Sequence, residues 1–279
     1  QATIDEIKRW YDGYSWDGKT SVYNPFSTLQ LFNNNQFIDY WFASGTPTFL
    51  VNLIRERNDV ATVTKPFEMS ASGFDAFEIT TLNTRLLLFQ TGYLTVKNVQ
   101  TNMFDNVQEF VLGIPNEEVR RGLLTYLLSD FSQYSIVETP IMRNRMMKQL
   151  FDGDATALEN SLREMFARIP YQLHVPLEAY LHSLFLLWLN LLGFKVDAEV
   201  QTNIGRLDAV WTWAERVVIA EVKYSVKGNV APLLDEAMSQ IRKRRYWERY
   251  GKDKRIAILA VAFAGKEIGC RMEELKCEF

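Results

Sequence analysis

The chain has little cysteine and no long apolar segment. Its two cysteines, Cys270 and Cys277, have a spacing that matches no common zinc-binding pattern. Two thiols are too few for the disulfide scaffold of a small secreted domain, so we expect reduced thiols and a cytoplasmic location. The longest apolar run, 184–192, contains Asn190 and is too short to cross a bilayer. These shortages exclude a disulfide-stabilised domain and a protein built on membrane-spanning helices.

A strong excess of charge of either sign is also missing, because the net charge is only −3. The 279 residues are 47% hydrophobic and 23% charged, which is typical of a globular protein long enough for two domains. The charge is nevertheless uneven. The part from 171 to 279 has 16 Lys and Arg against 14 Asp and Glu, whereas the remainder has 15 against 20. The C-terminal part is therefore the mildly basic one.

Basic residues gather in 242–255, where eight Lys and Arg face two acids. The aromatic residues Tyr246, Trp247 and Tyr250 are interleaved with them. Such a stretch suits contact with a phosphate backbone and stacked bases. It is equally typical of a solvated amphipathic helix whose aromatics pack on a sheet. The residues we expect to contact nucleic acid are Arg206, Arg242, Lys243, Arg244, Arg245 and Arg249.

Three charged residues stand out in an apolar part of the chain. The segments 207–213 and 217–224 read as two short strands joined by a tight connection. Asp208 lies at the start of the first strand, and Glu221 and Lys223 lie on the second. Residues two apart on a strand point to the same face, and burying unpaired charge is costly. Together, three such groups can hold a divalent cation and orient a water for attack on phosphate.

The elements around these residues follow the order helix, three strands, helix, strand, which predicts an α/β domain. The flanking elements are expected at 176–192 (helix), 194–200 (strand), 232–250 (helix) and 255–264 (strand).

With Asp208 followed by Glu221-x-Lys223 on consecutive strands of this order, the segment from about 170 to 275 resembles the PD-(D/E)XK nuclease superfamily. In particular, it is similar to the nuclease-like domain that follows an AAA-ATPase-like domain in many bacterial proteins of unknown function. The resemblance implies a restriction-endonuclease-like fold with an αβββαβ core in residues 170–279. It also implies hydrolysis of phosphodiester bonds in nucleic acid, with DNA as the expected partner.

The resemblance assigns roles residue by residue. Asp208 and Glu221 would be ligands of Mg²⁺ or Mn²⁺, and Glu178 matches the first-helix acid that many members add to the metal site. Lys223 would position or activate the water, or stabilise charge on the phosphate. Gln240 matches a polar helix position that some members place near the site.

Two features depart from the family pattern. The proline of the family name is absent, because Leu207 precedes Asp208. Tyr246 follows Gln240 by six residues, a wider spacing than the Gln-to-Tyr motif of some DNA-repair members.

The same residues also allow simpler interpretations. Asp208 can pair with Arg206 or Arg216 at a strand edge, and Glu221 and Lys223 can form an ordinary ion pair that contributes little.

At the level of function, the alternative to an active nuclease is a degenerate nuclease fold that serves as a binding or regulatory module. Glu178 in a first helical turn also suits the helix dipole. We expect His182 to be a packing or surface residue and not a metal ligand.

A third interpretation is nucleotide binding through Gly13–Thr20, which fits the Walker A spelling G-x-x-x-x-G-K-[ST]. A working phosphate loop needs a buried strand before it and a helix directly after it. Here the preceding residues are charged and helical in character, and the following 21–25 is extended up to Pro25. We therefore expect the match to be a coincidence.

The first 169 residues resemble the trailing part of the AAA-ATPase-like domain. The segments that carry the resemblance are YDGY (11–14), VYNPF (22–26), YWFASG (40–45), LFQTGYLT (88–95) and IPNEEV (114–119). The resemblance implies that the nucleotide-binding core lies upstream, in a part of the protein that this fragment lacks.

This N-terminal region is expected to be mostly helical, with a domain boundary at Pro170. The amphipathic segment 75–89, a β-hairpin of 93–99 with 108–112, and a helix to Leu128 capped by Asn116 follow one another. Helix, hairpin and helix allow a winged-helix-like module at about 75–130. Such modules bind DNA or proteins, and the lack of a basic face favours protein contact.

Overall fold

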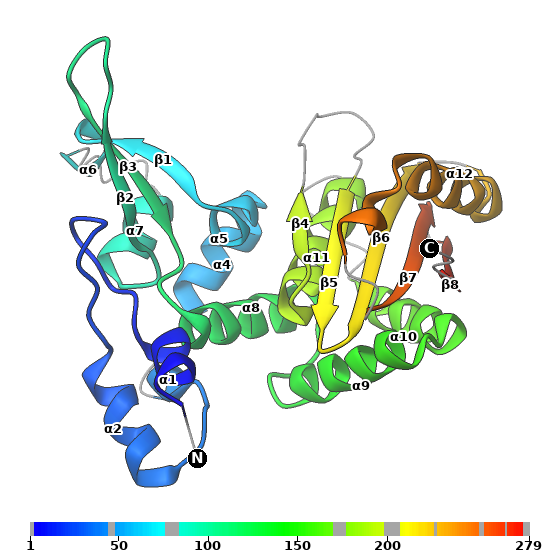
Figure 1. Ribbon diagram of the computed structural model, residues 1–279, viewed down its shortest axis with the longest axis horizontal. Helices are drawn as coiled ribbons and strands as arrows, with labels where there is room; N and C mark the ends of the chain where they lie inside the picture. The colour runs from blue at the N-terminus through cyan, green and yellow to red at the C-terminus, as the bar shows by residue number, and fades with distance from the viewer. Residues whose placement is uncertain are drawn as a thin grey trace. The chain divides into compact units, whose positions relative to one another are not determined.

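The computed structural model describes residues 3–43, 48–75, 84–169, 177–197, 207–225, 228–250, 254–265 and 267–275. The chain divides into two compact units, residues 1–130 and 131–279, whose elements are labelled in Figure 1. The first unit contains a three-stranded sheet and the second a five-stranded sheet.

The first unit is mostly helical, as predicted. Its helices are α1 (Ile4–Tyr11), α2 (Pro25–Asn34), α3 (Tyr40–Ala43), α4 (Thr48–Arg57), α5 (Ala61–Thr64), α6 (Ser72–Asp75), α7 (Thr84–Gln90) and α8 (Glu117–Ser132), the last of which runs two residues into the second unit. Its strands are β1 (Phe67–Ser70), β2 (Thr95–Thr101) and β3 (Gln108–Gly113), in the antiparallel order β1-β3-β2. Local chemistry sets the helix starts, since Asn24 caps α2 and Pro25 fills its first position.

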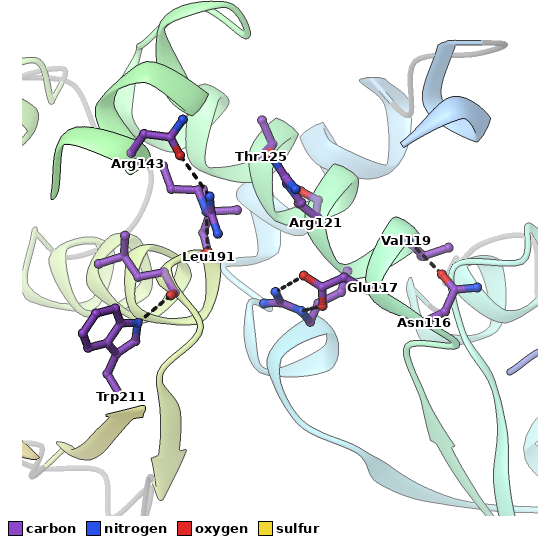
Figure 2. Close-up of polar contacts among 11 residues, drawn as sticks. Asn116, Glu117, Val119, Arg121, Thr125, Arg143, Leu191 and Trp211 are labelled. Carbon is purple, nitrogen blue, oxygen red and sulfur yellow. Dashed lines mark hydrogen bonds and ion pairs between the residues drawn. The ribbon is translucent and has the colours of Figure 1, made fainter. Parts of the chain in front are cut away.

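The predicted hairpin and the following helix are confirmed. β2 and β3 pair as an antiparallel hairpin, and the Asn116 side chain accepts the Val119 N–H at 3.0 Å at the start of α8 (Figure 2). The predicted helix 75–89 is observed as α7 in its second half, and 76–83 lie outside the described residues. The winged-helix-like module stays a prediction, with the difference that β3 also pairs with β1.

A buried carboxylate connects three helices of the first unit. Glu118, in the first turn of α8, is fully buried and accepts hydrogen bonds from the Ser27 hydroxyl at 2.6 Å and the Trp41 N–H at 2.9 Å. Burial raises the pKa of Glu118, while these two hydrogen bonds oppose the rise. The side chain thereby satisfies a buried donor on α2 and a partly buried donor on α3.

The Walker A-like stretch has no phosphate-loop geometry. It follows α1, and no helix begins until α2 starts at Pro25. The Asp17 carboxylate accepts the backbone N–H groups of Lys19 at 2.9 Å and Thr20 at 2.8 Å. These hydrogen bonds hold the pKa of Asp17 well below its usual range. Because the chain's own carboxylate already occupies the backbone donors that a phosphate would need, the structure favours the coincidence over nucleotide binding.

The second unit has a five-stranded mixed sheet. Its helices are α9 (Glu138–Asp152), α10 (Ala155–Ala167), α11 (Leu177–Leu192), α12 (Val230–Arg244) and the short 3-10 helix η1 (Tyr246–Arg249). Its strands, in spatial order, are β4 (Lys195–Asp197), β5 (Leu207–Trp213), β6 (Arg216–Ser225), β7 (Arg255–Ala264) and β8 (Glu267–Glu274). β6 and β7 are parallel and all other neighbours are antiparallel. The predicted order from α11 to β7 is therefore present, and β8 is an additional strand.

Helices cover both faces of this sheet. On one face, Ile219 of β6 and Ile258 of β7 share a core cluster with Met238 of α12. On the other face, Phe263 of β7 contacts Phe185 of α11, with ring centroids 5.4 Å apart. Burial on both faces explains why β6 and β7 read as nearly continuous apolar runs in the sequence.

Hydrogen bonds anchor α11 to its neighbours at its C-terminal end. The Trp211 indole N–H donates to the Leu192 carbonyl at 3.0 Å, and the Arg143 Nε donates to the Leu191 carbonyl at 2.9 Å (Figure 2). These bonds satisfy carbonyls that have no partner within the helix, and they tie α11 to β5 and α9.

The division of the chain differs from the predicted boundary after residue 169. The structure places α9 and α10 in the second unit. Phe166 of α10 packs on Phe263 of β7 at 5.0 Å, and the Glu159 carboxylate accepts the Cys270 N–H of β8 at 2.8 Å. The predicted boundary rested on Pro170, which lies outside the described residues, whereas the helix before it packs on the sheet of the second unit.

The helix before β7 is shorter than the predicted 232–250. Asn229 caps α12 at its start, and the helix ends where Arg245 adopts a left-handed conformation with φ of 50°.

Within the part of the chain that the structure covers, we find no helix long and apolar enough to cross a membrane. Cys270 is a half-buried free thiol, and Cys277 lies outside the described residues.

Replacing Glu118 with alanine should destabilise the first unit by about 2–4 kcal/mol, because buried donors on α2 and α3 lose their acceptor. The matched control is Glu117→Ala, since Glu117 is partly exposed and pairs with Arg120 on its own helix at 2.7 Å. That control should change stability by less than about 0.5 kcal/mol. Equilibrium urea unfolding followed by circular dichroism measures both, and equal losses in the two variants would contradict the role of Glu118.

Candidate functional site

Three acidic positions share one register of the five-stranded sheet. Asp197 of β4 pairs with Asp208 of β5, and Asp208 pairs with Glu221 of β6. Directly opposed residues of antiparallel strands lie on the same side of a sheet, so these three positions form a row. The alternative of an ion pair between Asp208 and Arg216 is wrong, because the two residues lie at opposite ends of the β5–β6 hairpin. Asp208 is opposite Glu221 in the strand register, whereas Arg216 is opposite Trp213.

Glu221 and Lys223 lie together on β6, as their spacing predicts. The Glu221 side chain is 2% exposed and that of Lys223 is 14% exposed. Lys223 Nζ lies 3.7 Å from Glu221 Oε1. Both side chains lie on the face that α12 covers, two and four residues along the strand from Ile219 of the apolar cluster. An ion pair therefore replaces apolar packing at the C-terminal end of β6.

Two residues of α12 contact the same ammonium group. Lys223 Nζ donates to Gln240 Oε1 at 2.6 Å and to Glu236 Oε1 at 2.8 Å. The proximity of Gln240 to the ion pair was predicted, whereas Glu236 was missed. Residues four apart on a helix share a face, so the position of Glu236 one turn before Gln240 is the signal that points to it.

Asp197 was also missed. Its pairing with Asp208 depends on how β4 and β5 align across a connection whose course the sequence does not reveal. The signal in the sequence is an acidic residue at the C-terminal end of one strand, Asp197, and another near the N-terminal end of the next strand, Asp208.

Some predicted site residues lie beyond what the structure describes. It gives the backbone of Glu178, in the first turn of α11, and of Asp208, but not their side chains, and Arg206 lies outside the described residues. His182 of α11 packs on Tyr224 with ring centroids 5.8 Å apart. Tyr224 alternates with Lys223 along β6 and so faces the opposite side of the sheet. The expected packing role of His182 is confirmed.

The basic stretch is partly neutralised by carboxylates. Arg242 forms an ion pair with Glu273 of β8, and Arg245 pairs with Glu248 at 2.8 Å. Lys243 is exposed and Arg244 is half-buried, while the Arg249 side chain is not described. The predicted nucleic-acid surface is therefore less positive than its sequence indicates.

The aromatic residues of this stretch have a packing role. Trp247 and Tyr250 are partly buried against the apolar cluster beneath α12, while the Tyr246 side chain lies outside the described part. For the two described aromatics, the interpretation as sheet packing is thus confirmed.

The family comparison agrees with this geometry. Residues 177–273 match the PD-(D/E)XK nuclease superfamily, so this segment is a domain of that superfamily. The match begins with α11 and ends within β8, and it includes Asp208, Glu221, Lys223 and Gln240. Membership implies the restriction-endonuclease-like α/β fold, with which the mixed sheet and its covering helices are consistent.

The chain as a whole is similar to an "uncharacterized protein in vnfD 5'region" from Azotobacter chroococcum mcd 1. The two are 32% identical over 270 residues, which is 93% of this chain and 50% of the relative. The chain thus spans about half the length of that relative. No solved structure matches the chain significantly.

The donor set fits a hard divalent cation. Carboxylate oxygens are the ligands that Mg²⁺ and Mn²⁺ prefer, and the Glu221 carboxylate is buried in register with Asp208. Among the side chains that the structure describes, no three His, Cys, Asp or Glu residues are gathered as a metal site. A metal site at this place would need side chains besides Glu221, those of Asp208 and Glu178, which lie outside the described part.

Lys223→Met should destabilise the second unit by about 1–3 kcal/mol, because the buried Glu221 carboxylate loses a nearby positive charge. Adding Glu221→Gln to that variant should restore most of the loss, since the carboxylate charge is then gone as well. Urea unfolding of the single and double variants measures the coupling. Lys195→Met, at an exposed position of β4, is the control and should have little effect. Additive losses in the double variant would contradict an energetic link between the two side chains.

Proposed function

We propose that the second unit hydrolyses phosphodiester bonds of nucleic acid in a divalent-metal-dependent reaction. The observation that carries this proposal is the buried Glu221–Lys223 pair on β6, in register with Asp208, inside a segment that matches the PD-(D/E)XK nuclease superfamily. A carboxylate and an ammonium are retained here at a position where apolar residues would pack at lower cost.

In this proposal Asp208 and Glu221 hold Mg²⁺ or Mn²⁺, with Glu178 of α11 as a further ligand. When bound, such a cation supplies a Lewis acid that polarises the phosphate and offsets charge in the transition state. Glu221 suits this role because its burial keeps bulk water from competing for the cation.

Lys223 is the residue that we propose acts directly on the reacting atoms. Its ammonium group lies 3.7 Å from the Glu221 carboxylate, where it can orient the attacking water or stabilise charge that develops on the phosphate. Gln240 Oε1 accepts a hydrogen bond from Lys223 Nζ at 2.6 Å and so restricts where the ammonium points. We assign Gln240 a positioning role, since it acts through Lys223.

The proposed substrate is nucleic acid, with DNA expected. Lys243, at the exposed C-terminal end of α12, is a candidate for contact with the phosphate backbone, together with Arg244. Arg206 and Arg249 belong to the same proposed surface. Arg242 and Arg245 can contribute only by exchanging their carboxylate partners for phosphate.

The proposed setting is a longer cytoplasmic protein. The first unit would be the trailing part of an AAA-ATPase-like domain, as its sequence resemblance implies, and the relative of twice the length is compatible with such an arrangement.

The second candidate function is a nucleic-acid-binding or regulatory module on a degenerate nuclease fold. The observation that favours it is that Glu236 and Gln240 already occupy two donor positions of Lys223. Metal affinity and turnover separate the two functions, because a degenerate site loses both.

Mn²⁺ and Mg²⁺ should bind the chain, and Asp208→Ala and Glu221→Ala should each abolish binding because the cation loses a charged ligand. Isothermal titration calorimetry measures this, with Glu267→Gln as a control at an exposed carboxylate on β8. Lack of binding by the unchanged protein at millimolar metal, also with DNA present, would contradict the proposed metal site.

Labelled DNA and RNA, single-stranded and duplex, should be cleaved with Mg²⁺ or Mn²⁺ and not with EDTA. Lys223→Ala should lower the cleavage rate by about 10²–10⁴-fold while Mn²⁺ binding persists, because the residue acts on the reacting atoms and not as a ligand. Binding of nucleic acid without cleavage of any of these substrates would favour the degenerate module.

A further inference from the structure

Lys223 is surrounded by acceptors of very different exposure. Its Nζ lies 2.6 Å from Gln240 Oε1, 2.8 Å from Glu236 Oε1 and 3.7 Å from Glu221 Oε1. The Glu221 side chain is 2% exposed, whereas that of Glu236 is 62% exposed. Glu236 is thus the one of these acceptors that belongs to the surface.

An ammonium group has three protons to donate. Gln240 and Glu236 accept two of these hydrogen bonds, so a phosphate oxygen that approaches Lys223 from solvent competes with the exposed one of the two, Glu236. Glu221 is buried and Gln240 is half-buried, so of the three residues Glu236 moves aside with the least change in packing. Glu236 can rotate into water, because an ion pair with a largely exposed partner contributes little to stability.

We propose that Glu236 occupies the phosphate position at Lys223 when no nucleic acid is bound, and that a phosphate of the substrate displaces it. The inference rests on the proposed function of the same site. It adds a residue, Glu236, that neither the family match nor the Asp208 and Glu221-x-Lys223 motif assigns.

Displacement of this kind selects for polymeric substrates. A single inorganic phosphate gains one contact with Lys223 and must replace an existing one with Glu236. A nucleic-acid strand makes further backbone contacts, for example with Lys243, and these offset the loss. The consequence is a site that excludes small anions and opens for a polyanion.

The neighbouring acid provides a matched control. Asp235 lies beside Glu236 on α12, has a 68% exposed side chain and forms an ion pair with Arg271 of β8. Removing Asp235 also deletes one negative charge and releases one basic residue on the same surface. The two variants therefore differ in whether the released cation is Lys223 or Arg271.

The test is the affinity for fluorescein-labelled single-stranded and duplex DNA, measured by fluorescence anisotropy with Ca²⁺ in place of Mg²⁺ to prevent turnover. Glu236→Ala should lower Kd by about 3–10-fold, because the phosphate no longer competes with a carboxylate. Asp235→Ala should change Kd by less than about twofold. Inorganic phosphate should compete with DNA more effectively in Glu236→Ala than in the unchanged protein.

A double variant tests whether the gain passes through Lys223. In a Lys223→Ala background, Glu236→Ala should give no further gain in affinity, because the two side chains act as a pair. Thermal unfolding of every variant verifies that the fold is retained. Glu236→Ala should unfold like the unchanged protein, because Glu236 is exposed and alanine suits a helix, whereas the variants without Lys223 should unfold at a lower temperature.

Three results would overturn the inference. Equal gains in DNA affinity for Glu236→Ala and Asp235→Ala would show that the effect comes from general surface charge. A gain in DNA affinity on replacing Glu236 that persists in the Lys223→Ala background would show that Glu236 acts through a residue other than Lys223. Weaker DNA binding in Glu236→Ala would make Glu236 a residue that positions Lys223. Absence of nucleic-acid binding by all proteins would instead contradict the proposed function itself, and the role of Glu236 with it.

Discussion

The second unit depends on how it accommodates one buried carboxylate. Glu221 lies in a strand whose other buried residues are almost all apolar, and transfer of a charge into such surroundings is costly unless a partner compensates. Lys223 provides the partner, and Gln240 and Glu236 in turn satisfy Lys223. The charge on β6 is therefore tied to α12, so that the crossover helix is both the cover of the apolar sheet and the support of the site.

Features that depend on local chemistry could be predicted from the sequence. The spacing of Glu221 and Lys223 predicted that both side chains lie on one face of a strand, and Asn116 predicted where α8 begins. The hairpin of β2 and β3 followed from two alternating segments, and the order from α11 to β7 followed from the switch between strand and helix periodicity. Each of these features is set by residues close together along the chain.

Features that depend on tertiary packing could not be predicted. The row of Asp197, Asp208 and Glu221 requires the register of three strands, and the contact of Glu236 requires the rotation of α12 about its axis. The division after residue 130 reflects the packing of α10 on the sheet through residues such as Phe166, and the sequence of α10 does not reveal which surface its apolar face contacts. β8 was missed because many of its residues are polar and only partly buried.

The polar character of β8 has a consequence for how this domain behaves at high local concentration. β8 and the short β4 are the outer strands of the sheet, and unpaired outer strands are templates for pairing with another chain. β8 carries Glu267, Arg271, Glu273 and Glu274, and two of these are held in ion pairs with α12. An added strand would have to align with this charged pattern. The β8 edge of the domain is thereby protected against edge-to-edge aggregation when many copies are brought together.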